Sequence, residues 1–483
     1  MSFRDSTVVI IDTGRSTIKA GQGIHELLRT PTVDIPARVA RRKNAVAPKE
    51  ENSAEGEAPK PLRPSSYLVG PQIDEALANG EELDIFWPFE GGDKAGAVSD
   101  WTQAEALWKY VLFTGLKIRR TQNESPVLLG VPSTVGRDGY AKIAQIFFER
   151  FNVAGLSVVE RPLLQLYAAN AVSGIVVDIH NECTDITVIH ESAIQTQASV
   201  IAPLGVRHCE EYLAHLLATN QTLVTSLEPQ PDIHATLVRL ARHLWQGGHI
   251  KVPLAGDVAP PEEEDEGITN IAAVVVAGRE KAVVEANNRK KNTKNSTAAE
   301  RAREAEIAAL DLLTIEFEDK QVTVGKDRHR FCEPLFDPTV LKNVKSVQED
   351  LKNPKSVLGL QEWVNYSASL VEFVWRYAVY EAVFVTGELS VLDKSLAQGL
   401  HSRLLPYVLK AEEAANDSQP KLVRSVRVPE YFAEYREKGD GLAAFLGGSI
   451  VAKLTFCDSS ARNYVSKNDY SSRGPAALLE YMV

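Results

Sequence analysis

The sequence predicts an α/β fold of two similar lobes that face one cleft. Two β-branched runs, residues 8–11 and residues 175–177, each end on an aspartate, Asp12 or Asp178. A polar turn and a second strand-like segment follow each run, so one strand-turn-strand pattern occurs twice, far apart in the chain. A repeat of this size suggests two similar lobes. Elsewhere, strand-like and helical patterns alternate, as in an α/β fold with mixed sheets.

Composition narrows the class of protein. The chain has 483 residues, of which 44% are hydrophobic and 24% charged, and its net charge is -11. This length allows about three domains, and the charge argues against a chain that wraps nucleic acid by itself. Residues 8–11 are too short for a signal peptide, and no apolar run reaches the roughly 20 residues of a membrane helix. We therefore expect an intracellular protein without a membrane partner.

Cysteine and histidine spacing predicts no metal site. The four cysteines are scattered without a C-x-x-C pair, so neither a disulfide nor a zinc finger is expected. The ten histidines form no H-x-x-x-H or H-E-x-x-H pair. A reducing compartment fits this usage.

The expected elements of the first lobe follow in order. Residues 30–39 contain two prolines and are expected to be extended, and the composition of residues 41–66 predicts a mobile loop. Residues 41–43 are either part of a nuclear import signal or ordinary solvated charge. Asp100 is expected to cap a helix that extends to about Leu116. Further elements are expected as a buried strand at 126–132 and helices at 138–151 and 162–170.

A charged segment interrupts the second half of the chain. Helical patterns follow Pro203-Leu204-Gly205 and run to about Gln246. Residues from about 255 to 315 then combine an acidic run with a basic polar stretch, which predicts an insertion that is partly helical and partly disordered. The later elements are expected as a hairpin at 317–331 with Gly325 in its turn, a helix at 364–380, a strand at 382–387, a linker at 410–421, a strand at 423–428 and a small-residue helix at 443–453.

Several motifs together resemble the actin family. They keep actin's order and nearly its spacing, and they are Val8-Val-Ile-Ile-Asp-Thr-Gly with Lys19-Ala-Gly, Pro126-Val-Leu-Leu, Gln145-Ile-Phe-Phe-Glu-Arg-Phe-Asn152, Leu166-Tyr-Ala, Ile175-Val-Val-Asp178, Val324-Gly-Lys-Asp-Arg-His-Arg-Phe331, Gly447-Gly-Ser-Ile-Val-Ala and the stretch from Val465 to Pro475. The resemblance implies the actin-like fold, a duplicated ribonuclease-H-like architecture of two lobes with a central nucleotide-type cleft.

The resemblance also implies how the chain divides. Residues 1–168 with 442–483 would form the outer lobe, which holds subdomains 1 and 2 and the loop at 41–66. Residues 169–441 would form the inner lobe, which holds subdomains 3 and 4 and the insertion at about 255–315.

Other stretches depart from actin. They resemble the fungal nuclear actin-related proteins that are subunits of SWI/SNF-class and RSC-class chromatin remodellers, and they are residues 265–270, 277–279, 429–435 and 474–478. This resemblance implies a nuclear protein that acts in transcription regulation.

An actin-type ATP site takes parts from both strand-turn-strand units. Turn glycines let backbone N–H groups approach the phosphates, a lysine neutralises charge, and strand-end acids hold hydrated Mg²⁺. Compared with actin position by position, the parts retained here are Asp12, Gly14, Lys19, Asp178 and Gly387. No cofactor is expected, but residual ATP binding at these positions stays open. The alternative is an inherited scaffold in which Lys19 bridges Asp12 and Asp178.

Both phosphate turns have lost residues that actin has. Arg15 and Ser16 replace the serine and the second glycine of actin's first turn, and Ile179-His180-Asn181-Glu182 replaces actin's Ser-Gly-Asp-Gly turn. The glycine losses raise the steric cost of phosphate approach. Glu182 would also put an anion where phosphates lie. Arg15 is expected either to offset that charge or to fill the cleft by pairing with Glu182 or Asp178.

Two water-positioning residues are also gone. Arg161 stands where actin has a glutamine, and Asp185 stands where actin has a histidine. Phosphoryl transfer depends chiefly on such positioning, so we expect a degenerate site without ATP hydrolysis.

Two candidate partner surfaces remain. In actin a groove between two subdomains accepts partner helices, and the matching positions here are Tyr167, Val172, Val451, Leu454 and Phe456. Residues 429–435 place three aromatic residues in an expected surface loop, either as an interface anchor or in local packing, and they are Tyr431, Phe432 and Tyr435.

The sequence therefore predicts a non-catalytic actin-related scaffold subunit of an ATP-dependent chromatin remodeller. The resemblance implies a heterodimer with a second nuclear actin-related protein on the helicase-SANT-associated (HSA) helix of the remodeller ATPase, tuning motor coupling. It also implies contacts with other remodeller subunits, indirect contact with nucleosomes and no homopolymer. The alternative is an actin-like protein that is switched by nucleotide and slowly hydrolyses ATP. A sugar or acetate kinase of the same fold lacks support because those kinases have no actin C-terminus.

Overall fold

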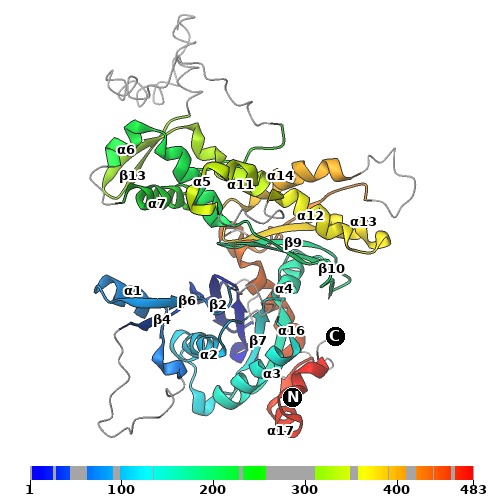
Figure 1. Cartoon of the computed structure of the whole chain (residues 1–483). Coiled ribbons are helices and arrows are strands. Elements are labelled where there is room, and N and C mark those ends of the chain that lie inside the picture. Colours follow the sequence, from blue (N-terminus) through cyan, green and yellow to red (C-terminus); the bar gives the residue numbers. More distant parts are fainter. Residues whose placement is uncertain are drawn as a thin grey trace, which may run out of the picture.

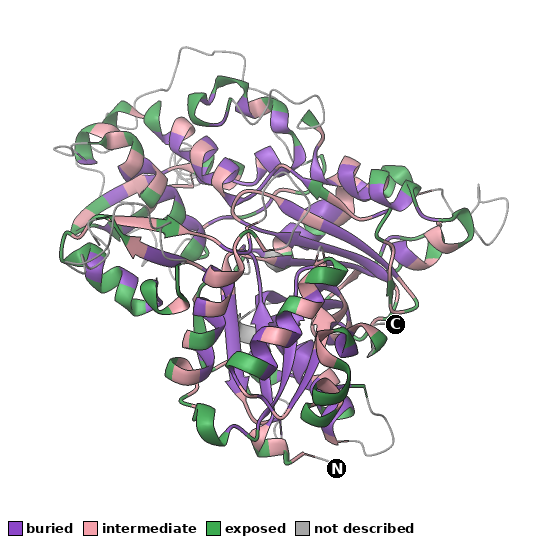
Figure 2. Ribbon diagram, turned by 60° about the horizontal axis from the view of Figure 1, so that its bottom comes forward, coloured by how far each residue is buried: buried purple, intermediate pink, exposed green. Residues whose placement is uncertain are grey.

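A computed structural model of the chain has two lobes on either side of a cleft (Figure 1). The structure describes residues 3–24, 29–43, 62–90, 98–133, 135–227, 232–256, 311–348, 357–389, 391–408, 420–438, 440–457 and 463–481. Each lobe is built around a six-stranded sheet whose central strands are buried (Figure 2). The expected α/β fold of two lobes is confirmed.

The sheet of the outer lobe has the strand order β17-β8-β7-β1-β2-β3. Its strands are β1 (Val9–Thr13), β2 (Thr17–Gln22), β3 (Val33–Pro36), β7 (Pro126–Val131), β8 (Gly155–Glu160) and β17 (Val465–Ser466). β1 pairs antiparallel with β2 and parallel with β7. This register places Asp12 of β1 opposite Lys19 of β2.

The sheet of the inner lobe has the order β11-β10-β9-β15-β16, with β12 paired to β10. Its strands are β9 (Gly174–Ile179), β10 (Thr184–His190), β11 (Ala193–Ile194), β12 (Val200–Ala202), β15 (Val383–Gly387) and β16 (Ser425–Val426). β9 pairs antiparallel with β10 and parallel with β15, and the register places Asp178 opposite Asp185.

Both sheets therefore repeat one arrangement. In each, a hairpin has a parallel strand beside its first member, β7 beside β1 and β15 beside β9. This topology confirms the predicted repeat. It also brings Asp12 and Asp178 to the carboxyl ends of two central strands, where ligands of α/β sheets usually bind.

The outer helices begin and end close to the expected positions. Asp100 caps α2 (Trp101–Tyr110), because its Oδ1 atom accepts from the backbone N–H groups of Thr102 and Gln103. One π-helical turn each, at Val111–Gly115 and Ile146–Arg150, prolongs α2 and α3. The other helices of this lobe are α1 (Pro71–Ala78), α3 (Arg137–Gln145), α4 (Arg161–Ala168), α16 (Ala443–Cys457) and α17 (Lys467–Arg473).

The inner helices lie beside the second sheet and above it in Figure 1. They are α5 (Val206–Ala218), α6 (Gln221–Leu227), α7 (Ile233–Gln246), α11 (Glu333–Phe336), α12 (Leu360–Ser369), α13 (Arg376–Tyr380), α14 (Asp393–Leu404) and α15 (Ala433–Lys438). Short 3-10 turns lie at Asp5–Thr7, Pro64–Ser66, Arg120–Gln122, Lys326–Arg330, Pro338–Asn343, Lys345–Val347, Phe373–Trp375, Leu405–Tyr407, Asp440–Leu442 and Gly474–Tyr481. The single helix expected at 364–380 is thus divided into α12, a 3-10 turn and α13.

The described ends of the expected loop at 41–66 belong to regular elements, β4 (Val39–Arg42) at one end and the 3-10 turn Pro64–Ser66 at the other. Arg41 and Arg42 belong to β4, which pairs with β5 (Leu68–Val69) and β6 (Leu83–Phe86). Pairing with β6 accounts for this strand, and it places Arg41 opposite Asp84 at 3.5 Å. Residues 44–61 lie outside the described part of the chain.

The hairpin expected at 317–331 is displaced. It is formed by β13 (Leu313–Phe317) and β14 (Lys320–Val324), and its turn is Glu318-Asp319 rather than Gly325. Both turn residues have positive φ, 47° and 63°, as a two-residue hairpin turn requires. Of the expected insertion, residues 257–310 lie outside the described residues, and so do residues 410–419 of the expected linker.

Helix α16 packs tightly between α4 and the outer sheet. A Cβ on Gly447 would lie 1.8 Å from the Leu164 carbonyl oxygen, so only glycine allows this close approach. Among the described residues, one helical stretch, Asp440–Cys457, is long and apolar enough to cross a membrane, and 67% of it is buried inside the protein. That burial is typical of a core helix.

Candidate functional site

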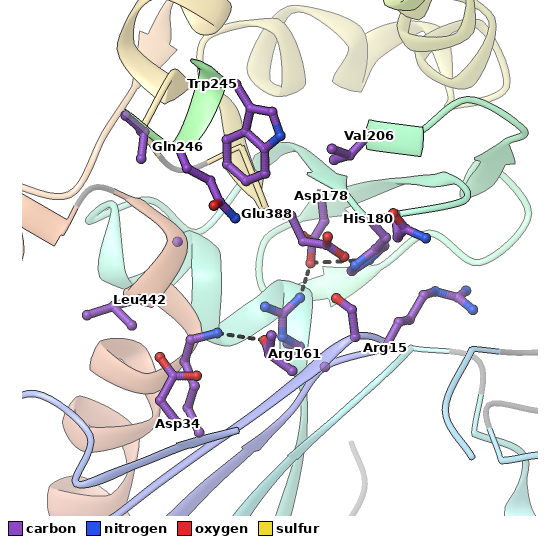
Figure 3. A pocket seen from close by; sticks show the side chains of 18 of the residues that line it. Arg15, Asp34, Arg161, Asp178, His180, Val206, Trp245, Gln246, Glu388 and Leu442 are labelled. Atoms are coloured by element: carbon purple, nitrogen blue, oxygen red, sulfur yellow. Dashed lines mark hydrogen bonds and ion pairs between the residues drawn. The ribbon is translucent and has the colours of Figure 1, made fainter. Parts of the chain in front are cut away.

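The cleft between the lobes has a volume of about 900 Å³ and is lined by both strand-turn-strand units (Figure 3). Asp12, at the end of β1, is 1% exposed, and Asp178, at the end of β9, is 4% exposed. Two buried carboxylates need partners, since an unpaired buried charge is costly. The identity of those partners decides what the cleft can bind.

Arg161 is the partner of both aspartates. It is the first residue of α4, is itself buried, and its Nε atom donates to Asp12 Oδ1 at 2.8 Å. Its Nη1 atom forms an ion pair with Asp178 Oδ2, which also accepts from Gln165 Nε2 at 2.7 Å. Burial alone would lower the pKa of Arg161, but the two carboxylates outweigh it and raise that pKa.

The charge on Asp178 is held in place by the same contacts. Burial would raise its pKa, but Arg161, His180 and Gln165 together outweigh burial and lower that pKa. Lys19 was expected to bridge the aspartates, and this expectation is wrong. The Lys19 Nζ atom donates instead to Thr17 Oγ1 at 2.7 Å, because β2 carries both residues on one face of the strand.

Arg15 pairs with a partner that the sequence did not suggest. Its Nε and Nη2 atoms donate to the two carboxylate oxygens of Asp185 at 2.7 and 3.0 Å, and its Nη1 atom donates to the Glu90 carbonyl oxygen at 2.7 Å. The expected pairing with Glu182 or Asp178 is therefore wrong. Asp185 lies opposite Asp178 in the β9–β10 register, which places it nearer the first turn.

His180 completes this charge cluster. Its Nε2 atom lies 3.4 Å from Asp185 Oδ2 and 3.7 Å from Asp178 Oδ2. Burial would lower the pKa of His180, but the two carboxylates outweigh it and raise that pKa. In turn, His180 and Arg15 lower the pKa of Asp185 against the effect of burial.

Glu182 points away from the cluster. Its Oε2 atom accepts from Arg207 Nε at 2.6 Å, and its Oε1 atom accepts from Asn181 Nδ2 at 2.9 Å. Its side chain is 39% exposed. The expected anion at the phosphate position is thus directed toward α5, which begins at Val206.

The cleft does not fit the magnesium nucleotide that an actin-like fold implies. A hydrated Mg²⁺ needs carboxylate oxygens that face open space, whereas Asp12 and Asp178 both accept N–H groups of Arg161. One amide of each turn is also engaged, since Gly14 N–H donates to Thr17 O at 2.9 Å and His180 N–H donates to Cys183 O at 2.8 Å. The two aspartates serve an ion-pair network.

Gly387 is retained for a structural reason. Its φ is +125°, and a Cβ there would lie 2.1 Å from the Ile179 carbonyl oxygen. Close approach of β15 to β9 therefore requires a glycine at this position, whatever occupies the cleft.

The far wall of the cleft contains residues that sequence reasoning missed. Glu210 accepts a bidentate pair from Arg242 at 2.9 and 2.6 Å and a hydrogen bond from Trp245 Nε1 at 2.9 Å. Burial raises the pKa of Glu388, and its Oε1 atom has no hydrogen-bond partner in the part of the chain that the structure describes. These residues come from α5, α7 and the loop after β15, and no local motif connects them.

Comparison with known proteins decides the family. The actin family model matches residues 3–481. This chain belongs to the actin family. Among curated relatives, the SWI/SNF and RSC complexes subunit arp9 of Schizosaccharomyces pombe is 25% identical, with 99% of each chain covered. Actin-related protein 7 of Arabidopsis thaliana is 24% identical (97% of this chain, 98% of the relative), and actin-related protein 4 of that plant is 22% identical (80% and 77%). The predicted resemblance to actin-related proteins is confirmed.

The actin-family helix groove is only partly exposed in this chain. Val172 is 57% exposed and Leu454 is 63% exposed, while Tyr167 and Val451 are half-buried beside them on α4 and α16. Phe456 is 1% exposed and belongs to the core, where its ring lies 5.9 Å from that of Phe3. The expectation that Phe456 lines the groove is therefore wrong, because the α16 face that carries it points to the N-terminal segment.

The aromatic segment at 429–435 is mostly core. Phe432 is 8% exposed and Tyr435 is 1% exposed, and both pack with Leu166 and Phe384 between the lobes. Tyr435 Oη also donates to the Arg29 carbonyl oxygen at 2.7 Å. Local packing, the alternative interpretation of this segment, accounts for the burial of Phe432 and Tyr435.

Tyr431 remains at the surface. It is 69% exposed, and its ring centroid lies 4.4 Å from that of Phe432. The expected interface anchor is thus reduced to one side chain.

Proposed function

We propose that this actin-family chain is a non-catalytic, nuclear scaffold subunit of an ATP-dependent chromatin-remodelling complex. The observation that carries the non-catalytic part is the Arg161 guanidinium between Asp12 and Asp178. It binds the two carboxylates that an ATPase of this fold needs for its metal ion. Support for the remodeller comes from the relative that is named as a subunit of SWI/SNF and RSC complexes and matches the whole chain.

Loss of hydrolysis follows from two replaced side chains. Arg161 and Asp185 occupy the positions at which actin-like ATPases orient the attacking water, and both form ion pairs here. A guanidinium cannot accept a proton from water, because it has donors only. The position of the water-orienting glutamine therefore offers no proton acceptor, and both carboxylate oxygens of Asp185 are bound by Arg15.

The partner in this proposal is a long helix of the remodeller ATPase, the HSA helix. An apolar helix face would lie on Val172 and Leu454, with Tyr167 and Val451 beneath. Val172 and Leu454 are 57% and 63% exposed, so both are available to an apolar helix face. Binding of this helix beside a second actin-related protein would set how the motor couples to DNA.

A second apolar surface suits contact with another subunit. It lies on α12, the following 3-10 turn and α13, which are consecutive and in contact. Its side chains are 40–50% exposed and are Tyr366, Leu370, Phe373, Val374 and Tyr377. We assign this surface to the second actin-related protein or to other remodeller subunits, through which the chain would meet nucleosomes indirectly.

One experiment tests the absence of catalysis. The purified full chain should release no phosphate from ATP above the buffer blank, in the presence or absence of Mg²⁺. Phosphate release that disappears in an Asp12→Asn variant would overturn the scaffold proposal. It would favour the alternative, an actin-like protein that binds and slowly hydrolyses ATP.

A second experiment tests the groove. We expect Val172→Asp and Leu454→Asp to weaken co-purification of the remodeller helix by ~10-fold or more, because each puts a charge against an apolar helix face. The matched control is Leu422→Asp, since Leu422 is 56% exposed and lies in the inner lobe away from α16. Equal binding by all three variants would show that the helix binds elsewhere.

A further inference from the structure

Arg161 connects the two lobes through its position in the chain. Its backbone begins α4 directly after β8, so it belongs to the outer lobe. Asp12 is in the same lobe, whereas Asp178 is at the end of β9 in the inner lobe. One guanidinium therefore holds a carboxylate of each lobe. Figure 3 shows its contact with Asp178.

We infer that Arg161 is the resident cation of this cleft, in the place of a metal nucleotide, and that it keeps the lobes joined without any ligand. A guanidinium has five donors in a fixed planar fork and keeps its charge at all physiological pH values. It can therefore satisfy two carboxylates at once, which an ordinary actin-like cleft would leave to a hydrated divalent ion. This inference concerns the cleft and does not rest on the proposed partners.

A second pair acts in parallel. Arg15 belongs to the β1–β2 turn of the outer lobe and binds Asp185 of β10 in the inner lobe through two hydrogen bonds. Its third contact, to the Glu90 carbonyl oxygen, fixes the guanidinium to the outer lobe. The side chains of Arg15 and Asp185 are 7% and 19% exposed, so solvent screens this pair weakly.

The charges of the cluster nearly balance within the protein. Three aspartates, Asp12, Asp178 and Asp185, face two arginines and His180. A buried cluster of this kind is stable only when every member is paired. Removal of one arginine leaves a buried carboxylate without its cation, and the lobes are then expected to separate at the cleft.

The test is amide hydrogen exchange on the full chain, read at the two phosphate-type turns, residues 13–17 and 179–184. In the wild-type protein, exchange at these turns should not change on addition of EDTA, Mg²⁺ or Mg²⁺ with ATP. A slowing of exchange by Mg²⁺ with ATP would show that a ligand joins the lobes and would overturn the inference.

Substitution of the cation should open the cleft. We expect Arg161→Gln to speed exchange at both turns by ~10-fold or more, because opening exposes these amides. Exchange in the β13–β14 hairpin, at the far end of the inner lobe, should stay unchanged. Unchanged exchange at the turns would overturn the inference. The matched control is Arg38→Gln, since Arg38 pairs with Asp74 within the outer lobe at 2.6 Å.

A second variant covers the case in which Arg161→Gln does not fold. Arg15→Gln removes a pair that is less buried on its carboxylate side, and it should speed exchange at the same two turns while leaving β13–β14 unchanged. Wild-type exchange rates in Arg15→Gln would contradict a ligand-free connection between the lobes.

Discussion

Arg15 and Asp185 form a bidentate ion pair across the cleft, with Nε to Oδ2 at 2.7 Å and Nη2 to Oδ1 at 3.0 Å. In the sequence, each residue replaces one that serves the ATP site of actin, which has a serine at the first position and a histidine at the second. In the structure, the two replacing residues bind each other. Replacement of a phosphate-binding turn and a water-positioning residue has thus created a connection between the lobes.

The first prediction concerns Asp185→Asn. The substitution leaves the Arg15 guanidinium buried without a charged partner, so it should lower the free energy of unfolding by about 2–4 kcal/mol at pH 7. The measurement is urea unfolding of both proteins. The control is Asp74→Asn, because Asp74 also pairs with an arginine but is 64% exposed, and its loss should have little effect.

Acid should remove this difference. The pKa of Asp185 is lowered in the folded protein, so its stabilisation is present above the ordinary carboxyl pKa of about 4 and is lost as the pH falls below it. Wild type and Asp185→Asn should therefore approach each other below about pH 4. A difference that persists unchanged into acid would mean that the carboxylate charge is not the cause.

The second prediction concerns His180→Gln. The pKa of His180 is raised in the folded protein by Asp178 and Asp185, so its stabilisation is fully present below about pH 6.5 and is lost as the pH rises through the folded pKa. Wild type should exceed the variant most at pH 6 and least at pH 9. Urea unfolding at a series of pH values measures this, and a margin that grows with pH would refute it.

The sequence predicted the strands and the aspartates at their ends, but it did not predict which charged side chains form ion pairs. Asp12 and Asp178 were expected at strand ends because β-branched runs are local signals. Which arginine reaches which aspartate depends on contacts 149 or 170 residues apart in the chain. Lys19 is opposite Asp12 in the sheet register, yet the start of α4 brings Arg161 closer to the carboxylates.

Two other errors have local causes. Gly325 suggested a turn, but the true turn uses Glu318 and Asp319 at positive φ, which sequence patterns rarely favour without glycine or asparagine. Phe456 follows Leu454 by two residues, so the two side chains point to different faces of α16. Spacing along a helix could have excluded Phe456 from the groove before the structure was known.

The third prediction concerns Gly387→Ala. A Cβ at this position would meet the Ile179 carbonyl oxygen at 2.1 Å on a backbone with φ of +125°, so the substitution should cost more than about 3 kcal/mol or prevent folding. The matched control is Gly80→Ala, where φ is +77° but no atom lies within 4 Å. It should cost only about 1 kcal/mol. Comparable losses in both variants would show that φ alone decides, without the contact between β15 and β9.

The last prediction concerns Glu160→Gln. Glu160 ends β8 beside Tyr140 of α3, and burial raises its pKa to about 7. Because the folded protein holds this proton more tightly than the unfolded chain does, Glu160 costs stability as the pH rises from its ordinary value of about 4.3 toward 7. Glutamine does not ionise, so the variant should gain roughly 1–3 kcal/mol relative to wild type between pH 5 and pH 8.

Chemical unfolding at these two pH values measures that gain. The control is Glu75→Gln on the exposed face of α1, which should show the same difference from wild type at both pH values. A Glu160→Gln variant that loses stability between pH 5 and pH 8 relative to wild type would show that the ionised carboxylate has a partner. In that case the end of β8 would carry a second charged contact beside Arg161, and the charge count of this region would include Glu160 as one more anion.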